Sequence, residues 1–393
     1  MARDNYRTLL VKFGGRRFRR ISLILLSLLV ATAAIFVLAP PAKAGLHTSL
    51  FVLQILDAPV KPQSWVTKEP LREQVTYPTP RGEGVADIYR IPGDERRAAV
   101  LIFLGANAAG RDDTDVIKLG DALARAGFAV MLHWSPTMGL QSNIDPNEIE
   151  SLVWAFQHLR SREFVDQRRA GIGGFSVGGS LAMVAAADPR IRDHVVFINS
   201  FGAYYDAQDL FLQIASSNSF YEGHHEPWEV DQLTRLVFTN EMIESLEHPA
   251  ERELLEFRFL RNGDVVESAL VDMSDHAQIV WRLLEGPTLE EAGALFENLP
   301  PEFRQQMVGI SPSSHVADLQ ARVMVLHDEG DLLIPVGETR RLAAALQERG
   351  DFRYTETRIF DHVRPGGGGD FWLLIAEAAK LYWHMYGIIR VAT

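Results

Sequence analysis

Apolar residues in this chain alternate between short unbroken runs and longer stretches in which they recur every three to four positions. Residues 98–104 are apolar throughout, which is typical of a strand buried on both faces of a sheet. Residues 114–126 instead carry apolar side chains at helical spacing and stop at Gly127, the pattern of a helix with a glycine C-cap. This first pair of segments predicts a buried strand followed by an amphipathic helix.

The same alternation continues along most of the chain. Two short strands are predicted before it, at 74–77 and 85–90. The further predicted strands are 128–132, 169–173, 194–198, 322–327 and 352–360, and the further helices are 145–159, 179–187, 337–347 and 370–386. Repeated strand–helix units imply an α/β fold, with a mostly parallel sheet covered by helices on both faces.

The alternation stops in the middle of the chain, where residues 201–312 form one predominantly helical stretch. Its candidate helices are 227–238, 250–260, 275–284, a capped segment from Thr288, and 302–307, with no strand predicted among them. We therefore predict a core made of residues 76–200 and 313–393, with a helical lid or cap inserted between its two parts.

The first 44 residues predict a basic segment followed by a membrane anchor or a signal. Four arginines between positions 16 and 20 precede an uncharged apolar run over 21–41, which places the N-terminus in the cytoplasm and the following domain outside. The run is near the ~20 residues needed to span a bilayer, which favours a retained transmembrane helix. An Ala-x-Ala pattern leaves open a signal cleaved after Ala44 and a secreted protein. Residues 45–75 are predicted as a linker on the domain surface.

Charge is distributed unevenly along the chain, whose formal net charge is −12. Residues 1–44 hold eight basic residues and one acidic residue, a net of +7, whereas the rest holds 31 basic and 50 acidic residues, a net of −19. An acidic body argues against nucleic acid as a partner. The chain has no cysteine, which excludes disulfides, thiolate catalysis and cysteine-based zinc sites.

A Gly-x-Ser-x-Gly motif lies where a predicted strand meets a predicted helix. It runs from Gly174 to Gly178 with Ser176 at its centre. Strand, motif and helix in this order are the sequence form of a nucleophile elbow, a tight turn that lifts a serine hydroxyl above the sheet. The helix N-terminus beneath the serine carries partial positive charge, which favours an oxyanion.

Two further side chains follow strands of the same predicted sheet. Asp331 comes after the strand at 322–327, and His362 after the strand at 352–360. Because parallel sheets place their sites beyond the carboxyl ends of the strands, both are expected at the same edge as Ser176. A serine needs such a base, and the base needs such a carboxylate to orient it.

With these residues in the order Ser, Asp, His, the chain resembles the α/β-hydrolase superfamily, nearest to its dienelactone-hydrolase-like and esterase-like branches. The resemblance extends from about Ala98 to the C-terminus and rests on the Gly-Phe-Ser-Val-Gly-Gly elbow, an Asp-x-x-Ile-Pro sequence and His362. It implies an α/β-hydrolase fold in which Ser176 is the nucleophile, His362 the base and Asp331 the acid. Asp328 stands where the family often has glycine, which makes it an alternative acid.

The resemblance also implies where the oxyanion hole lies. The backbone N–H of Val177, the residue after the nucleophile, is expected to be one donor. The family takes the second donor from the loop after its third strand, which in this chain reads Leu-Gly-Ala-Asn-Ala-Ala-Gly at residues 104–110. We expect Ala106 to supply this donor, with Asn107 as the alternative.

The expected activity is hydrolysis of a carboxylic ester through an acyl-enzyme, on a small-molecule substrate and without a metal or cofactor. Acyl transfer or peptide hydrolysis by the same triad, and a non-catalytic binding domain of the same fold, are the alternatives. The sequence specifies neither the acyl group nor the oligomeric state.

Two other groups of side chains have a structural and a functional interpretation. A His-His-Glu run at 224–226 is predicted to be solvated rather than metal-binding. The last predicted helix carries aromatic residues on several sides, which we expect to pack on the sheet, with contact to a membrane surface as the alternative; they are Trp372, Tyr382, Trp383 and Tyr386.

Overall fold

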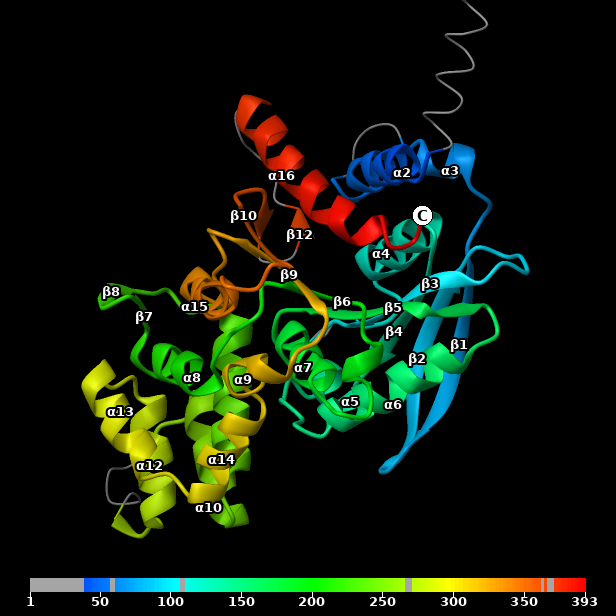
Figure 1. Cartoon of the computed structure of the whole chain (residues 1–393). Coiled ribbons are helices and arrows are strands. Elements are labelled where there is room, and N and C mark those ends of the chain that lie inside the picture. Colours follow the sequence, from blue (N-terminus) through cyan, green and yellow to red (C-terminus); the bar gives the residue numbers. More distant parts are fainter. Residues whose placement is uncertain (1–38, 57–60, 107–109, 266–270, 362–363, 366–370) are drawn as a thin grey trace, which may run out of the picture.

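An eight-stranded sheet runs through the centre of the molecule (Figure 1). The computed structural model describes residues 39–56, 61–106, 110–265, 271–361, 364–365 and 371–393. The strands of the sheet are β1 (Leu71–Thr79), β2 (Gly82–Arg90), β3 (Arg97–Phe103), β4 (Phe128–Trp134), β5 (Val165–Phe175), β6 (Phe197–Phe201), β9 (Arg322–Asp328) and β10 (Phe352–Thr357). Their order is β1-β2-β4-β3-β5-β6-β9-β10, with β2 antiparallel to both of its neighbours and every other pair parallel. The prediction of a mostly parallel sheet is confirmed.

Helices cover both faces of this sheet, and each face has its own apolar cluster. On one face lie α6 (Glu148–Ser161) and α7 (Val177–Ala186), and on the other lie α2 (Pro40–Ile55), α4 (Thr114–Arg125) and α16 (Phe371–Ile389). The alternate side chains of β3 divide between the two clusters, which is why its sequence is apolar without a break. Helix α4 begins after Asp113, whose carboxylate accepts hydrogen bonds from the N–H groups of Asp115 and Val116.

The predicted strands of the core are all present, with different ends. The largest displacement is at β6, predicted at 194–198 and found at Phe197–Phe201, because Arg192–His194 form a 3₁₀ turn (η1). Shorter elements complete the core: α5 (Pro136–Leu140), α15 (Val336–Leu346), β11 (Phe360–Asp361) and β12 (Arg364–Pro365).

The segment predicted as a linker at 45–75 contains regular structure. It holds most of α2, the short helix α3 (Gln63–Val66) and the beginning of β1. Phe51 and Val52 of α2 are buried in the same apolar cluster as α4 and α16, so this helix is a layer of the fold. The helix was not predicted, because its apolar residues do not follow a clear helical period beside the prolines that flank it.

The inserted residues 201–312 are mainly helical in their described part, but they also hold a hairpin that the sequence did not predict, β7 (Asn218–Tyr221) with β8 (His224–Pro227). Their helices are α8 (Ala207–Ser216), α9 (Gln232–Glu244), α10 (Pro249–Leu255), the π-helical η2 (Glu256–Leu260), α12 (Asp275–Leu284), α13 (Leu289–Glu297) and α14 (Pro301–Gly309). The helix predicted at 227–238 is wrong at its start, because Asp231 caps α9. The predicted capped segment from Thr288 is confirmed as α13, which begins with a capping box formed by Thr288 and Glu291. Two 3₁₀ turns, η3 (Pro312–Ser314) and η4 (Val316–Asp318), lead back to the core.

Within the described ranges, none of the helices has both the length and the apolar character needed to span a bilayer. Most of the apolar run over 21–41 lies outside those ranges. The N-terminal anchor therefore remains a prediction from the sequence.

Candidate active site

The elbow at Ser176 is a strained turn between β5 and α7. Ser176 has φ 54° and ψ −141°, a backbone conformation that residues other than glycine rarely adopt. Its N–H donates a 2.8 Å hydrogen bond to the carbonyl of Phe201 on β6, which holds the turn against the sheet. Strain of this kind persists only where the surroundings impose it.

Glycines let the three segments around the elbow approach one another. A Cβ atom added to Gly178 would lie 2.4 Å from the N atom of Gly105 and 2.5 Å from the carbonyl oxygen of Phe103. One added to Gly174 would lie 2.5 Å from the carbonyl oxygen of Gly178. Both contacts are with backbone, so no side chain could move aside. The Gly-x-Ser-x-Gly spacing is therefore a steric requirement of this turn.

Replacing Gly178 by alanine is expected to destabilise the fold by about 3 kcal/mol or more, because the new methyl group overlaps two backbone atoms. Gly293 in α13 is a matched control, since a Cβ there would have no atom within 4 Å. Gly293→Ala should stabilise by roughly 0.5–1 kcal/mol through helix propensity. Urea unfolding of both variants measures the difference. Equal stability of the two would contradict the steric account.

The expected oxyanion donors lie on either side of this close approach. Val177 is the first residue of α7 and is buried, so its N–H lies at the positive end of the helix. Gly105, with φ 72°, packs against Val177 and Gly178, and Ala106 follows it. Ala106 and Ser176 line the same cavity. Asn107 lies outside the described residues.

Asp331 is buried in the loop that follows β9, and its carboxylate is held by several groups. One oxygen accepts hydrogen bonds from the N–H groups of Leu333 (2.8 Å) and Ile334 (3.1 Å). The other lies 3.2 Å from Nε2 of His327. His327 Nε2 also donates to the carbonyl of Ile334, while Thr339 Oγ1 lies 2.9 Å from Nδ1. These contacts orient the Asp331 carboxylate through the backbone of its own loop.

Asp328, the alternative acid, has a different set of partners. One of its oxygens accepts hydrogen bonds from the N–H groups of Ile359 and Phe360, each at 2.9 Å, and from the hydroxyl of Thr357 at 3.1 Å. Its other oxygen accepts from the N–H of Gly330 at 3.0 Å. Asp328 thus ties the end of β9 to the chain that leaves β10, which explains a carboxylate where a glycine was expected.

His362 lies outside the described residues, as do residues 363 and 366–370. The described strands on either side of it are β11 and β12, which pair antiparallel through Phe360 with Pro365 and Asp361 with Arg364. The hydrogen bonds that the N–H groups of Ile359 and Phe360 donate to Asp328 therefore hold the chain up to two residues before the expected base.

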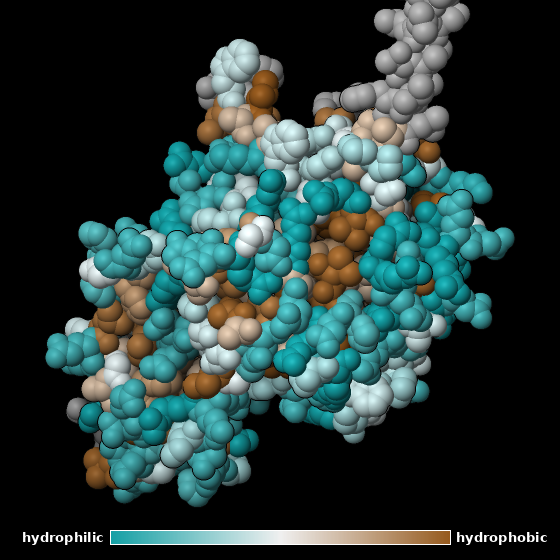
Figure 2. Space-filling view, in the orientation of Figure 1, coloured by the Kyte–Doolittle hydropathy of each residue, from teal (hydrophilic) through white to brown (hydrophobic). Residues whose placement is uncertain are grey.

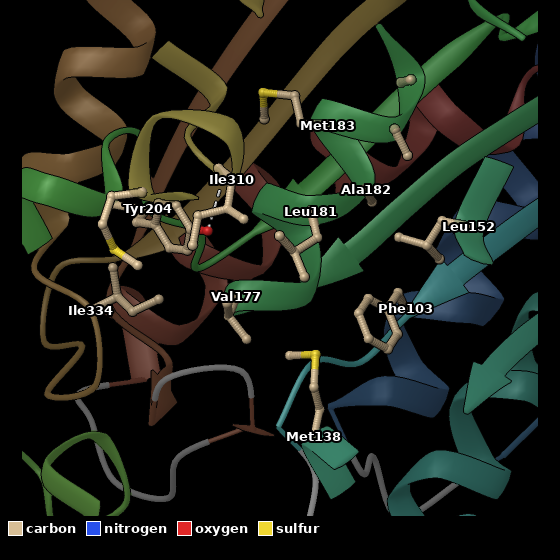
Figure 3. Close-up of a cluster of buried hydrophobic side chains, with 14 of the residues drawn as sticks. Phe103, Met138, Leu152, Val177, Leu181, Ala182, Met183, Tyr204, Ile310 and Ile334 are labelled. Carbon is tan, nitrogen blue, oxygen red and sulfur yellow. Dashed lines mark hydrogen bonds between the residues drawn. The ribbon is translucent and has the colours of Figure 1, made fainter. Parts of the chain in front are cut away.

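A cavity of about 630 Å³ contains Ser176 in its lining. Most of its lining is apolar and comes from both sides of the sheet edge: the inserted helices contribute Phe211, Phe238, Met242 and Phe303, and α2 and α16 contribute Phe51, Ile55, Leu381 and Met385. Figure 3 shows part of the buried cluster beside it, in which the hydroxyl of Tyr204 donates a 2.9 Å hydrogen bond to the carbonyl of Ile310. Burial raises the pKa of Tyr204, so this hydroxyl remains a donor. Large apolar groups therefore have room next to the serine.

One ionisable side chain in this lining was not anticipated from the sequence. Glu241 of α9 is mostly buried, and burial raises its pKa to about 7, although the N–H of Ile144, which donates to its carboxylate, opposes this rise. Glu241 links the inserted helix to the loop between α5 and α6. Nothing in its local sequence marks it, because an acidic residue near the end of a helix is usually solvated.

Stability is expected to depend on pH through Glu241. Because its folded pKa is about 7 and its ordinary value is 4.5, the folded state keeps a proton that the unfolded state releases between these values. The contribution of this proton to the free energy of unfolding is complete below pH 4.5, falls as the pH rises and is lost above about pH 7. Glu241→Gln should remove this slope and be more stable at high pH by up to about 3 kcal/mol. Glu253→Gln, at an exposed residue of α10 that does not act on the pKa of Glu241, is the control for urea unfolding at several pH values.

The His-His-Glu run, the other group of possible metal ligands, lies on the surface. His224, His225 and Glu226 are exposed on β8. In the described part of the chain, no three His, Asp or Glu side chains are grouped so that they could hold a metal ion.

Comparisons with known proteins give distant structural neighbours. No protein-family model and no curated protein matches the chain. A hyperthermophilic esterase from Pyrobaculum calidifontis has a TM-score of 0.45 at 15% identity, covering 88% of this chain and 91% of its own. Dipeptidyl peptidase 4 of Porphyromonas gingivalis has a TM-score of 0.47 at 13% sequence identity, and the match covers 81% of this chain and 36% of the peptidase. An acylaminoacyl peptidase of Pyrococcus horikoshii has a TM-score of 0.48 at 13% sequence identity, and the match covers 81% of this chain and 41% of the peptidase. The matched region is less than half of each peptidase.

Proposed function

We propose that this chain, which has an α/β-hydrolase fold, is a serine hydrolase that cleaves carboxylic esters through an acyl-enzyme. The observation that carries the proposal is the strained elbow, which holds Ser176 at the N-terminus of α7 and in the lining of an apolar cavity. A backbone held at positive φ for packing alone would be better served by glycine, which adopts it without strain. The fold class is the one that the sequence resemblance implied.

The proposed reaction uses this chain, its substrate and one water molecule. Ser176 Oγ attacks the ester carbonyl carbon while His362 accepts the hydroxyl proton, and the same proton then passes to the departing alcohol. Water attacks the acyl-enzyme in a second step, again with His362 as base, and releases the acid. Asp331 holds the imidazole in the tautomer that can accept this proton and stabilises the imidazolium.

Charge that develops on the carbonyl oxygen has expected partners near the serine. The N–H groups of Val177 and Ala106 are the proposed donors, and the N-terminal end of α7 adds its partial positive charge. In an apolar cavity such dipoles act more strongly than in water, because little solvent screens them. This arrangement favours the tetrahedral intermediate of acyl transfer.

The lining of the cavity supports an ester with a bulky or extended apolar acyl group. Its walls are formed largely by phenylalanine, leucine, isoleucine and methionine, and its volume of about 630 Å³ falls in the range of pockets that take small organic ligands. Burial of acyl methylenes against these walls would contribute roughly 0.8 kcal/mol each to binding.

We also propose that the N-terminal segment is retained as a membrane anchor, with the catalytic domain outside the cytoplasm. Support comes from α2, which starts at Pro40 and includes the Ala-x-Ala pattern. Ala44 is fully buried within this helix, so cleavage after it would cut a packed element of the fold. Detection of Gly45 at the N-terminus of the mature protein would contradict this proposal.

The test of the catalytic proposal is labelling by a fluorophosphonate probe, followed by a panel of p-nitrophenyl esters of rising acyl length. We expect Ser176 to be labelled and the longer acyl chains to be cleaved with higher kcat/KM. Ser161→Ala, which removes an exposed serine at the end of α6, should label like the unmodified chain. No labelling of Ser176 would favour a non-catalytic binding domain, and labelling without ester cleavage would favour acyl transfer or peptide hydrolysis.

A further inference from the structure

The first turns of α16 expose large apolar side chains to solvent. Trp372 is 72% exposed and Ile375 is 46% exposed, and Leu373 and Leu374 between them are exposed as well. Four consecutive residues point to nearly all sides of a helix, since each is turned by about 100° from the last. Their joint exposure means that this end of α16 projects from the body, and Figure 2 shows apolar side chains on that projection.

The remainder of α16 behaves differently. Leu381 and Ile389 are buried in the cluster that covers the sheet, so the C-terminal half of the helix is anchored in the fold. Trp383 is 56% exposed and lies 11 residues after Trp372, which places both on the same side of the helix, within about 20°. An exposed stripe with a tryptophan at each end therefore continues from the projecting turns along the anchored half.

Among the described side chains of these turns, from Trp372 onward, none that is exposed is acidic, and Asp370 precedes the helix in the sequence. The nearest acidic residue on the helix, Glu377, is 3% exposed, and it pairs with Lys380 at 2.8 Å and accepts from the N–H of Arg358. Arg353 donates to the carbonyl of Trp383 at 2.6 Å. The stripe thus has basic neighbours, although the chain beyond residue 44 is strongly acidic.

Helices α2 and α3 extend the same apolar character, and the sequence around them also holds Asp57 and Glu69. Helix α2 packs against α16, where Gly45 lies close to the Tyr382 hydroxyl, and it contains no acidic residue. The exposed large apolar side chains of α2 and α3 are Leu46, Leu53, Trp65 and Val66. Lysines stand at positions 43, 61 and 68 along this stretch. We call the exposed residues of α2, α3 and α16 together the α2–α16 face.

The chain outside the described residues joins this face. Residues 1–38 end where α2 begins, and their sequence holds four arginines followed by the uncharged apolar run from Ile21. A sequence of that composition predicts a lipid bilayer as its partner. Because only Ala39 separates it from α2, the α2–α16 face would lie at the bilayer surface.

We propose that the α2–α16 face rests in the interface of a lipid bilayer, with Trp372 and Ile375 inserted among the lipids. Tryptophan prefers the boundary between headgroups and acyl chains, and the leucine and isoleucine side chains prefer the acyl chains below it. This contact is separate from the N-terminal segment and orients the folded domain on the membrane.

In the proposed orientation, one end of the cavity faces the bilayer. Its lining runs from Ser176 to Phe51 and Ile55 of α2 and to Leu381 and Met385 of α16. These side chains lie on the inner sides of the two helices that bear the exposed face. A docked domain would hold this apolar end of the cavity next to the bilayer, which favours a lipid-dissolved ester over one dissolved in water.

The test uses the absence of cysteine from the chain, which allows a single label at a chosen site. The full chain with Ile375→Cys, labelled with an environment-sensitive fluorophore, is reconstituted in phosphatidylcholine–phosphatidylglycerol vesicles. Val308→Cys is the matched control, since Val308 is an exposed apolar residue of α14 in the inserted region. Quenching is measured with iodide in water and with lipids brominated on their acyl chains.

We expect the label at position 375 to be quenched by brominated lipid and protected from iodide, and the label at 308 to behave in the opposite way. Iodide access at 375 would overturn the proposal. Protection from iodide without quenching by brominated lipid would also overturn it, because protein would then cover the face. Quenching of both labels by lipid would contradict the assigned orientation.

A second readout rests on the proposed function. The double variant Trp372→Ser with Ile375→Ser should cleave a long-chain ester in vesicles at least about threefold more slowly, with unchanged activity on a dissolved short-chain ester. Equal loss on both substrates would count against docking. If the unmodified chain cleaves neither ester, the catalytic proposal fails, whereas the label measurements still decide the docking.

Discussion

Replacing Ser176 by alanine is expected to lower kcat for ester hydrolysis by at least about 10⁴-fold and to leave the folded state intact. The variant removes only Oγ, which is the atom that forms the bond to the acyl carbon in the proposed mechanism. Alanine tolerates the positive φ of this position about as poorly as serine, so the strain and the bond from N–H to Phe201 remain. Hydrolysis of a p-nitrophenyl ester and urea unfolding together measure the two effects.

The control for this experiment is Ser161→Ala, which should retain full activity. Residual hydrolysis by Ser176→Ala is expected, because donors aimed at the carbonyl oxygen can still act on attacking water. Retention of more than a tenth of the activity, in a variant free of contaminating unmodified protein, would show that Ser176 is not the nucleophile.

The parts of the fold that the sequence predicted are those where one physical requirement dominates. Strand β3 is apolar on both sides because both of its faces are covered, and its run is therefore unbroken. The elbow needs glycine at 174 and 178 because backbone occupies the space of a side chain. Such requirements leave little freedom in composition, so they are visible in one sequence.

Other features depend on contacts between segments that are distant in the chain. Helix α2 is stabilised by packing against α4 and α16, and its own sequence shows no clear helical period. Burial raises the pKa of Glu241, and the N–H of Ile144, 97 residues away in the chain, opposes this rise. The role of Asp328 depends on N–H groups near residue 360. A local pattern does not contain these relations.

The two candidate acids can be separated by two matched substitutions. Asp331→Asn is expected to lower kcat/KM by about 10²–10⁴-fold at neutral pH. The asparagine carbonyl can still accept from the N–H groups of Leu333 and Ile334, which places its NH₂ group where the second carboxylate oxygen stood. An NH₂ group cannot accept a hydrogen bond from the N–H of an imidazole, so His362 would lose the orientation proposed for catalysis. The cost in stability should be only about 1 kcal/mol, from the NH₂ group facing His327.

Asp328→Asn should have the converse effect, because Asp328 is proposed to act on the chain before His362 and not on the base. One Asp328 oxygen accepts a hydrogen bond from the N–H of Gly330, and the other accepts from the N–H groups of Ile359 and Phe360. The NH₂ group of an asparagine would therefore face an N–H donor in either orientation of the amide. We expect a loss of about 2–4 kcal/mol in the free energy of unfolding, since a buried N–H is left without an acceptor. Activity should fall mainly in proportion to the folded fraction and recover on cooling. If Asp331→Asn stays active while a fully folded Asp328→Asn does not, the acid is Asp328.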